Sequence, residues 1–184
     1  MKHSLLTPQE AAAHMHAGGV VAYPTEAVFG LGCDPGNEQA VQRILSLKQR
    51  PASMGLILIA SRLSQFDGFV APVDAAAAEA TWPGPVTWLF PRGPRTPDWI
   101  AGEHATVAIR VTAHPVARQL ADAFGGPLVS TSANPHSAPP AQAAGTVEDY
   151  FGHYIEGTVA GALGARESVS EIRDLASGKV LRGA

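Results

Sequence analysis

The sequence predicts an α/β fold, and three observations support that prediction. Short apolar runs that predict buried strands alternate with segments that carry helix signals, which is the pattern of α/β proteins. The length of 184 residues suits a single domain. Hydrophobic residues make up 46% of the chain and charged residues 16%, a balance typical of globular proteins. We find no internal repeat and no linker, so we expect one domain over residues 1–184.

The first helix and the first strand have clear boundaries. Thr7-Pro8-Gln9-Glu10 is a capping box with proline at the first helical position, and Gly18-Gly19 ends the helix. The apolar run at residues 20–23 predicts a buried strand. We expect residues 25–35 to be irregular, because prolines flank a glycine-bearing stretch.

The second helix begins at Asn37, which can cap it, and delivers Lys48 and Arg50 at its end. Later elements follow the same alternation of signals. We expect strands at residues 55–60, 86–90, 106–111 and 127–130, helices at 74–81, 114–124 and 147–151, and two short strands near the C-terminus.

The composition counts against several classes of protein. No apolar stretch reaches the roughly 18 residues of a membrane span, and the N-terminus shows no secretory leader, so we expect a cytoplasmic protein with no membrane contact. Cys33 is the only cysteine, so no internal disulfide can form. A net charge of −3 with three lysines argues against a protein built to grip nucleic-acid phosphates, unless the ten arginines gather on one face.

Two polar clusters follow strands and helices and are candidate ligand sites. Thr25 lies in the loop after the first strand, and ligands of α/β sheets bind outside strand ends. Lys48 and Arg50 flank one residue and could clamp a polyphosphate. The simpler alternatives are a capped turn for the loop of Thr25 and, for Lys48 and Arg50, cations that the dipole of a helix C-terminus favours. The residues alone favour these alternatives, and neither G-x-G-x-x-G nor a Walker A motif is present.

Two further features leave their alternatives open. The run from Ser130 to Asn134 is either a phosphate or ribose site or an ordinary turn. Arg110, inside a predicted strand, needs a partner if it is buried, either a ligand carboxylate or a structural Asp or Glu. The histidines lack ligand spacing, so we expect no metal site built by the protein itself.

Taken together, these stretches resemble the YrdC-like family of threonylcarbamoyl-AMP synthases, in its short single-domain bacterial branch. The resemblance covers about residues 19–182. The motifs that carry it, in order, are YPTEAVFGLGCDP, LKQRP, GLILIA, WPGPVT, VAIRVTAHP and PLVSTSAN. Each motif is weak alone, and their shared order and spacing make the resemblance specific.

The resemblance implies a twisted, mixed β-sheet flanked by helices, with a concave ligand-binding face. It also implies an activity: L-threonine, bicarbonate and ATP give threonylcarbamoyl-AMP and pyrophosphate, for modification of tRNA. ATP is then a substrate, with Mg²⁺ held mainly by its phosphates. The expected partners are the downstream tRNA threonylcarbamoyl transferase machinery and, weakly, tRNA or double-stranded RNA.

The resemblance also assigns residues. The threonine site takes Thr25, Arg110, Ser130 and Ser170, with Arg110 pairing the carboxylate. The ATP site takes Lys48, Arg50, Thr106, Ser132, Asn134 and Arg182, of which Lys48 and Arg50 are expected to be catalytic. Two positions depart from longer relatives: Ile59 replaces a substrate-contacting histidine, and Pro140 lies near the position of an ATP-contacting serine.

Two other functions remain possible at this point. One is a double-stranded RNA or ribosome-maturation binding module without catalysis, which would use a concave face to hold RNA by shape. The other is a carbamoyl-transfer domain, since related domains occur inside larger carbamoylation proteins. The mild acidity counts against the first, and the absence of fused partner domains counts against the second.

Overall fold

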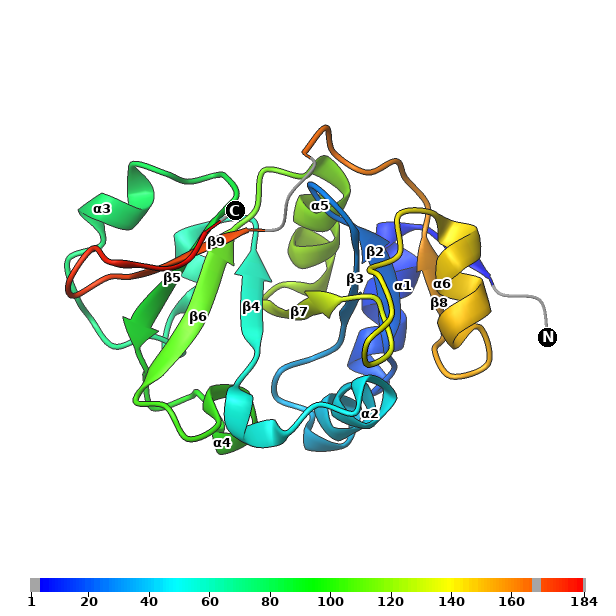
Figure 1. Cartoon of the computed structure of the whole chain (residues 1–184), viewed down its shortest axis with the longest axis horizontal. Helices are drawn as coiled ribbons and strands as arrows, with labels where there is room; N and C mark the ends of the chain where they lie inside the picture. Colours follow the sequence, from blue (N-terminus) through cyan, green and yellow to red (C-terminus); the bar gives the residue numbers. More distant parts are fainter. Residues whose placement is uncertain (1–3, 167–169, 184) are drawn as a thin grey trace.

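The structure is a computed structural model that describes residues 4–166 and 170–183. Its centre is a mixed sheet in the order β1-β8-β2-β3-β7-β4-β6-β5-β9-β10 (Figure 1). The strands are β1 (Leu5–Leu6), β2 (Val21–Pro24), β3 (Phe29–Gly32), β4 (Ile57–Ala60), β5 (Val86–Pro91), β6 (Thr106–Val111), β7 (Leu128–Ser132), β8 (Gly157–Val159), β9 (Glu171–Asp174) and β10 (Val180–Arg182). The pairs β2–β8, β4–β6 and β5–β9 are parallel, whereas β2–β3, β3–β7 and β4–β7 are antiparallel.

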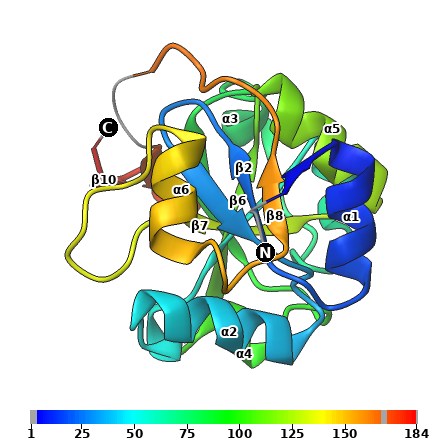
Figure 2. The ribbon, with the colours of Figure 1, turned by 90° about the vertical axis from the view of Figure 1, so that its right-hand side faces the viewer.

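The helices flank this sheet. They are α1 (Pro8–His16), α2 (Glu38–Lys48), α3 (Ala76–Glu79), α4 (Asp98–Ala101), α5 (Pro115–Phe124) and α6 (Ala144–Phe151), with 3₁₀ turns at Ala52–Met54 and Leu63–Phe66. Figure 2 shows α1 and α5 together on one side of the sheet and α2 and α6 on the other. The α/β class and the mixed, helix-flanked sheet are therefore confirmed. A single domain over residues 1–184 includes positions outside the described residues and stays a prediction.

The two predicted helix starts form as their local sequences require. In α1 the Thr7 hydroxyl accepts a hydrogen bond from the Glu10 amide at 3.2 Å, and the Glu10 carboxylate accepts one from the Thr7 amide at 2.8 Å. The Asn37 side chain accepts a hydrogen bond from the Ala40 amide at 3.0 Å and so caps α2. Each cap satisfies an amide that the helix itself leaves unpaired.

The prediction that residues 25–35 are irregular is wrong for Phe29–Gly32. These residues form β3 and pair with β2 through a tight turn, in which the amide and hydroxyl of Thr25 both donate to the Val28 carbonyl, at 3.2 and 2.6 Å. At Gly32 there is no room for a side chain. A Cβ on Gly32 would lie 2.6 Å from the Tyr23 ring and 2.6 Å from the Val129 carbonyl oxygen.

Three smaller elements were also not predicted. The edge strand β1 has two residues and the helix α4 has four, which is too short for a periodic pattern to appear. Three strands, β8, β9 and β10, follow α6 instead of the expected two.

Alternation along the strands gives the sheet two different faces. In β6, Val107, Ile109 and Val111 face a core shared with α2 and α6. Thr106, Ala108 and Arg110 face the other way, because successive side chains of a strand alternate. On that second face, α1 and α5 cover Tyr23, Ile59 and Leu128. The rest of that face, beyond α1 and α5, carries a pocket.

Candidate active site

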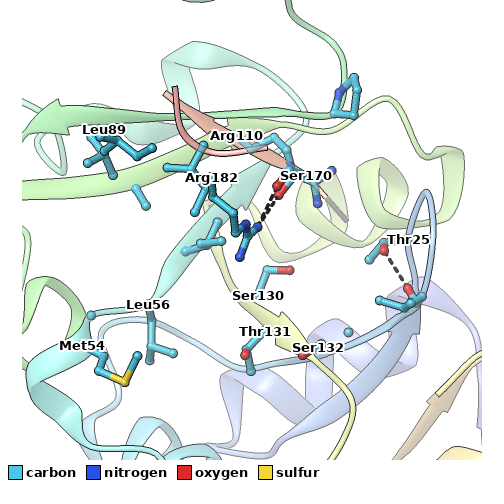
Figure 3. A pocket seen from close by; sticks show the side chains of 18 of the residues that line it. Thr25, Met54, Leu56, Leu89, Arg110, Ser130, Thr131, Ser132, Ser170 and Arg182 are labelled. Carbon is cyan, nitrogen blue, oxygen red and sulfur yellow. Dashed lines mark hydrogen bonds between the residues drawn. The ribbon is translucent and has the colours of Figure 1, made fainter. Parts of the chain in front are cut away.

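The pocket has a volume of about 420 Å³, which falls within the range typical of small-molecule sites. Its lining comes from the β2–β3 turn, the sheet strands and the segment after α2, which lie far apart in sequence (Figure 3). Eight of the ten site residues expected from the sequence line it: Thr25, Arg50, Thr106, Arg110, Ser130, Ser132, Ser170 and Arg182. Lys48 and Asn134 do not line it, and lie behind Ser132.

The lining is cationic. Four of the ten arginines line the pocket, namely Arg50, Arg110, Arg166 and Arg182. Among the described residues, Glu26 is the only acidic side chain in the lining. A chain with a net charge of −3 therefore concentrates positive charge in one cavity, which suits an anionic ligand.

Arg110 is held in this cavity by a buried ion pair. Its Nη1 donates to Glu26 Oε2 at 2.6 Å, and the two side chains are only 8% and 12% exposed. Its Nε is buried and has no hydrogen-bond partner among the described residues. Of the two partners considered from the sequence, Arg110 has the structural carboxylate and retains an unpaired donor for a second one.

Glu26 is a pocket residue that the sequence did not assign to the site. Its Oε1 accepts hydrogen bonds from the Thr112 hydroxyl at 2.7 Å and from the Ala113 amide at 3.1 Å. Burial by itself raises the pKa of the carboxyl, but the Arg110 charge and the hydrogen bonds from Thr112 and Arg110 outweigh it and lower the pKa below its ordinary value. Glu26 is therefore a fixed anion rather than a proton acceptor.

Lys48, which the resemblance assigns to the ATP site, lies outside the pocket lining and is engaged by the protein itself. The side chain is buried, and its Nζ donates to the carbonyl oxygens of Ser132 and Asn134 at 2.6 and 3.0 Å and to Asn134 Oδ1 at 3.1 Å. Burial, and next the charge of Arg50, lower its pKa to about 8. Lys48 thus fixes the turn after β7, which in turn presents Ser132 to the pocket.

Arg50 points into the pocket because the chain turns sharply after α2. Gln49 has a left-handed conformation with φ of 48°, which directs Lys48 and Arg50 to different places. The Arg50 Nη2 donates to the Gly55 carbonyl at 2.9 Å, while its Nε is buried without a partner in the described part of the chain. Burial lowers the pKa of Arg50, as expected for a cation with few compensating contacts.

Arg182 lies in β10 and adds another positive charge to the pocket lining. Its Nη2 donates to the Ser170 carbonyl at 2.7 Å, and Figure 3 shows Arg182 beside Ser170. The Thr87 hydroxyl donates to the Ser170 hydroxyl at 3.1 Å. Burial, and next the charges of Arg50 and Arg110, lower the pKa of Arg182. Arg50 and Arg110 are thus near enough to Arg182 to repel it, and an anion bound beside Arg182 would offset that repulsion.

The remaining lining separates polar from apolar walls. Ser130 and Thr131 of β7 lie near Ser132 (Figure 3). The Ser132 hydroxyl donates to Asn134 Oδ1 at 2.6 Å. Apolar side chains also line the pocket, among them Met54, Leu56, Leu89, Ile100, Ile172 and Leu181. A ligand with an anionic part and an apolar or aromatic part would match both walls.

The two positions that depart from longer relatives lie outside the lining. Ile59 pairs with Arg110 in the β4–β6 register but is fully buried in the core under α1 and α5. Pro140 lies in the loop before α6 and does not line the pocket.

Residues 4–166 and 170–183 hold no group of three or more His, Cys, Asp or Glu side chains that could bind a metal ion. Over the same residues, no helix is both long enough and apolar enough to cross a membrane.

Comparisons with known proteins point in one direction. Residues 13–184 match the family model Sua5_yciO_yrdC, described as telomere recombination. The chain is 54% identical over 177 residues to the threonylcarbamoyl-AMP synthase of Halorhodospira halophila, covering 95% of this chain and 93% of that protein.

Two solved structures show the same fold. P. abyssi Sua5 in complex with L-threonine is 32% identical with a TM-score of 0.87, over 94% of this chain and 52% of the longer Sua5 chain. E. coli YciO is 26% identical with a TM-score of 0.83, over 95% of this chain and 87% of YciO. The pocket thus belongs to a fold that binds threonine in one of its solved examples.

Proposed function

The chain belongs to the Sua5, YciO and YrdC family, and from this premise we propose that it is a threonylcarbamoyl-AMP synthase. It joins L-threonine, bicarbonate and ATP into threonylcarbamoyl-AMP and releases pyrophosphate. The observation that carries the proposal is the pocket, in which cations, hydroxyls and apolar side chains converge on a volume suited to small molecules. The threonylcarbamoyl-AMP synthase from H. halophila matches this chain over nearly its whole length.

Arg110 is our candidate for the threonine carboxylate. It lies buried in the lining, carries a permanent positive charge and has an unpaired Nε donor. Thr25, Ser130 and Ser170 supply hydroxyl groups in the same lining, and these could receive the polar groups of threonine.

Arg50 and Arg182 are our candidates for the ATP phosphates, with Ser132 and Thr106 beside them in the lining. Asn134 and Lys48 act from behind this surface, since Lys48 fixes the backbone of Ser132 and Asn134. The catalytic role expected of Lys48 is therefore exerted through the turn that it holds. Arg50 remains the cation of that motif placed to meet the leaving pyrophosphate directly.

The chemistry needs alignment more than a nucleophile from the protein. Bicarbonate loses hydroxide to give carbon dioxide, whose carbon the threonine amine attacks. A C–N bond forms and the amine loses a proton, which leaves a carbamate; the proton and the hydroxide leave as water. A carbamate oxygen then attacks the α-phosphorus of ATP, forming an O–P bond as the bond to pyrophosphate breaks. Fixed cations stabilise the charge that gathers on the leaving group, and a recessed pocket limits hydrolysis of the labile product.

Magnesium would enter with ATP. Glu26, the acid in the described lining, is already engaged by Arg110, so the lining offers no carboxylate cage for a protein-bound ion. An ion held by ATP phosphates and water is the arrangement that fits, and it matches the usual preference of Mg²⁺. Such an ion would neutralise charge on the phosphates while Arg50 and Arg182 orient them.

The product would serve a tRNA threonylcarbamoyl transferase system in the cytoplasm, as the family resemblance implies. A catalysis-free RNA module is not favoured, because four of the ten arginines line a pocket of small-molecule size. We expect tRNA or double-stranded RNA to bind weakly and to be displaced by salt.

The test is incubation of the pure chain with ATP, L-threonine and ¹³C-labelled bicarbonate, with no RNA present. We expect pyrophosphate release that requires all three substrates and a labelled product linked to AMP. Pyrophosphate release only in the presence of tRNA, or none with all three substrates, would refute the proposal.

A further inference from the structure

The β2–β3 turn reaches a strand that is not its neighbour in the sheet. In the strand order, β7 and β4 lie between β3 and β6. Nevertheless, Glu26 in this turn contacts three groups at the end of β6 and just beyond it: the Arg110 guanidinium, the Thr112 hydroxyl and the Ala113 amide. The Glu26 carboxylate therefore links the β2–β3 turn to the end of β6 beside the pocket.

The turn is also held from the other side. The Glu26 carbonyl accepts a hydrogen bond from the Arg166 amide at 3.1 Å, and the Thr25 carbonyl accepts one from the Gly164 amide at 3.0 Å. A Cβ on Gly164 would lie 2.7 Å from the Glu26 carbonyl oxygen, so the two segments are in close contact. Both the backbone and the side chain of Glu26 are thus fixed before any ligand arrives.

The nitrogen atoms of the Arg110 guanidinium differ in their hydrogen-bond partners. Nη1 is bound to Glu26, whereas Nε has no partner among the described residues, although burial makes an unpaired donor costly. A carboxylate binds arginine best through two parallel hydrogen bonds to one edge of the guanidinium. An arginine held at Nη1 is fixed in one orientation, and its Nε is left without a partner among the described residues.

We propose that Glu26 is a positioning residue of the threonine site: it holds Arg110 by Nη1 and so presents the Nε edge to the carboxylate of threonine. The inference rests on the proposed function only in naming threonine as the ligand of Arg110. Glu26 acts through Arg110 and takes no part in the bond-making steps.

The test compares two glutamates that both pair with a distant arginine. Glu156 binds Arg43 at 2.9 Å and accepts the Val20 amide at 2.6 Å, outside the pocket. We would measure L-threonine and ATP binding by calorimetry for the full chain and for Glu26→Gln and Glu156→Gln, with thermal melting to verify folding. We expect Glu26→Gln to weaken threonine binding roughly tenfold, as is usual for side chains in direct contact, and to leave ATP binding nearly unchanged. Glu156→Gln should leave both unchanged.

A double variant asks whether Glu26 works through Arg110. In an Arg110→Lys background, Glu26→Gln should add little further loss of threonine affinity. If Glu26→Gln does not fold, Glu26→Asp keeps the negative charge but is too short for all three contacts, and it should weaken threonine binding several-fold. Threonine affinity equal to that of the wild type in the folded variant, an equal loss for ATP, or a full additional loss in the Arg110→Lys background would overturn the role of Glu26.

The same data separate this inference from the proposed function. A wild-type chain that binds threonine but makes no AMP-linked product would refute the proposed activity, while the binding results would still decide the role of Glu26. A wild-type chain that binds no threonine at all would refute both.

Discussion

Two arginine–glutamate pairs in this molecule have similar geometry and different surroundings. Arg43 meets Glu156 at 2.9 Å, and Arg110 meets Glu26 at 2.6 Å, in each case between segments far apart in sequence. Arg43 also donates from Nη2 to the Tyr154 carbonyl at 2.5 Å, outside the pocket. Arg110 lies in the pocket lining and has a buried Nε without a partner in the described residues.

The difference teaches how a structural contact and a binding contact can be told apart. The Arg43 pair fastens α2 to the segment before β8, so its loss should appear in stability. The Arg110 pair fixes an arginine whose remaining donors are left for a ligand, so its loss should appear in affinity. Residue type is the same in the two pairs and the distances are similar, whereas burial, the unpaired donor and the neighbouring cavity distinguish them.

The largest expected effect comes from changing Arg110 itself. Arg110→Lys keeps a positive charge near Glu26 but cannot form two parallel hydrogen bonds to a carboxylate. We expect the threonine Michaelis constant to rise on the order of a hundredfold, as for loss of a buried charge-pair contact, with a much smaller change for ATP. Arg43→Lys is the matched control and should leave both constants unchanged. An equal rise for both substrates would mean that Arg110 is purely structural.

Lys48→Ala should show an intermediate result, because Lys48 is a cation near the pocket whose donors are already used. Its removal leaves the buried carbonyl oxygens of Ser132 and Asn134 without their partner, so we expect a loss of about 1–3 kcal/mol in the free energy of unfolding. The activity should fall mainly because the Michaelis constant for ATP rises. Denaturant unfolding and steady-state kinetics would measure both, with the exposed Lys179→Ala as control. Unchanged stability would show that the Lys48 contacts contribute nothing.

Acid titration should separate Glu26 from an ordinary surface carboxylate. Because the pKa of Glu26 is lowered in the folded state, its contribution to stability is present above its ordinary value of 4.5 and is lost as the pH falls through the lower, folded value. The unfolding free energy of the wild type should therefore decline on acidification below about pH 4.5 more steeply than that of Glu26→Gln. If the unfolding free energies of the wild type and Glu26→Gln fell in parallel with pH, the lowered pKa of Glu26 would be contradicted.

The smallest effect is expected at a third pair, Arg62 and Asp122, whose side chains are 61% and 50% exposed. An exposed pair contributes about 1 kcal/mol or less to stability, so Arg62→Ala should barely change the melting temperature or either Michaelis constant. A large kinetic effect there would show that distance from the pocket does not protect activity from the loss of an ion pair.

The sequence predicted those parts of the molecule that short-range signals determine. Thr7 and Asn37 cap their helices through contacts three residues away, so their roles follow from local sequence. The strand β3 was missed because its glycines suggest a loop, whereas at Gly32 the packing of Tyr23 and β7 leaves no room for a side chain. Eight of the ten site residues that the family resemblance assigned line one pocket.

The details of the site depend on contacts that no local pattern contains. Glu26 and Arg110 are 84 positions apart, and only the path of the β2–β3 turn over the strand ends brings them together. Lys48 and Arg50 look equivalent in sequence, but the left-handed Gln49 between them buries one and directs the other into the pocket. Such roles require the three-dimensional course of the chain.

The most direct test of the central claim is the ¹⁵N–¹H NMR signal of the Arg110 Nε group during titration with L-threonine. We predict a large shift for Arg110, because its Nε gains a carboxylate partner, and no shift for Arg43, which lies outside the pocket. Arg110→Lys would identify the signal. An Arg110 signal that stays unchanged at saturating threonine would contradict the account.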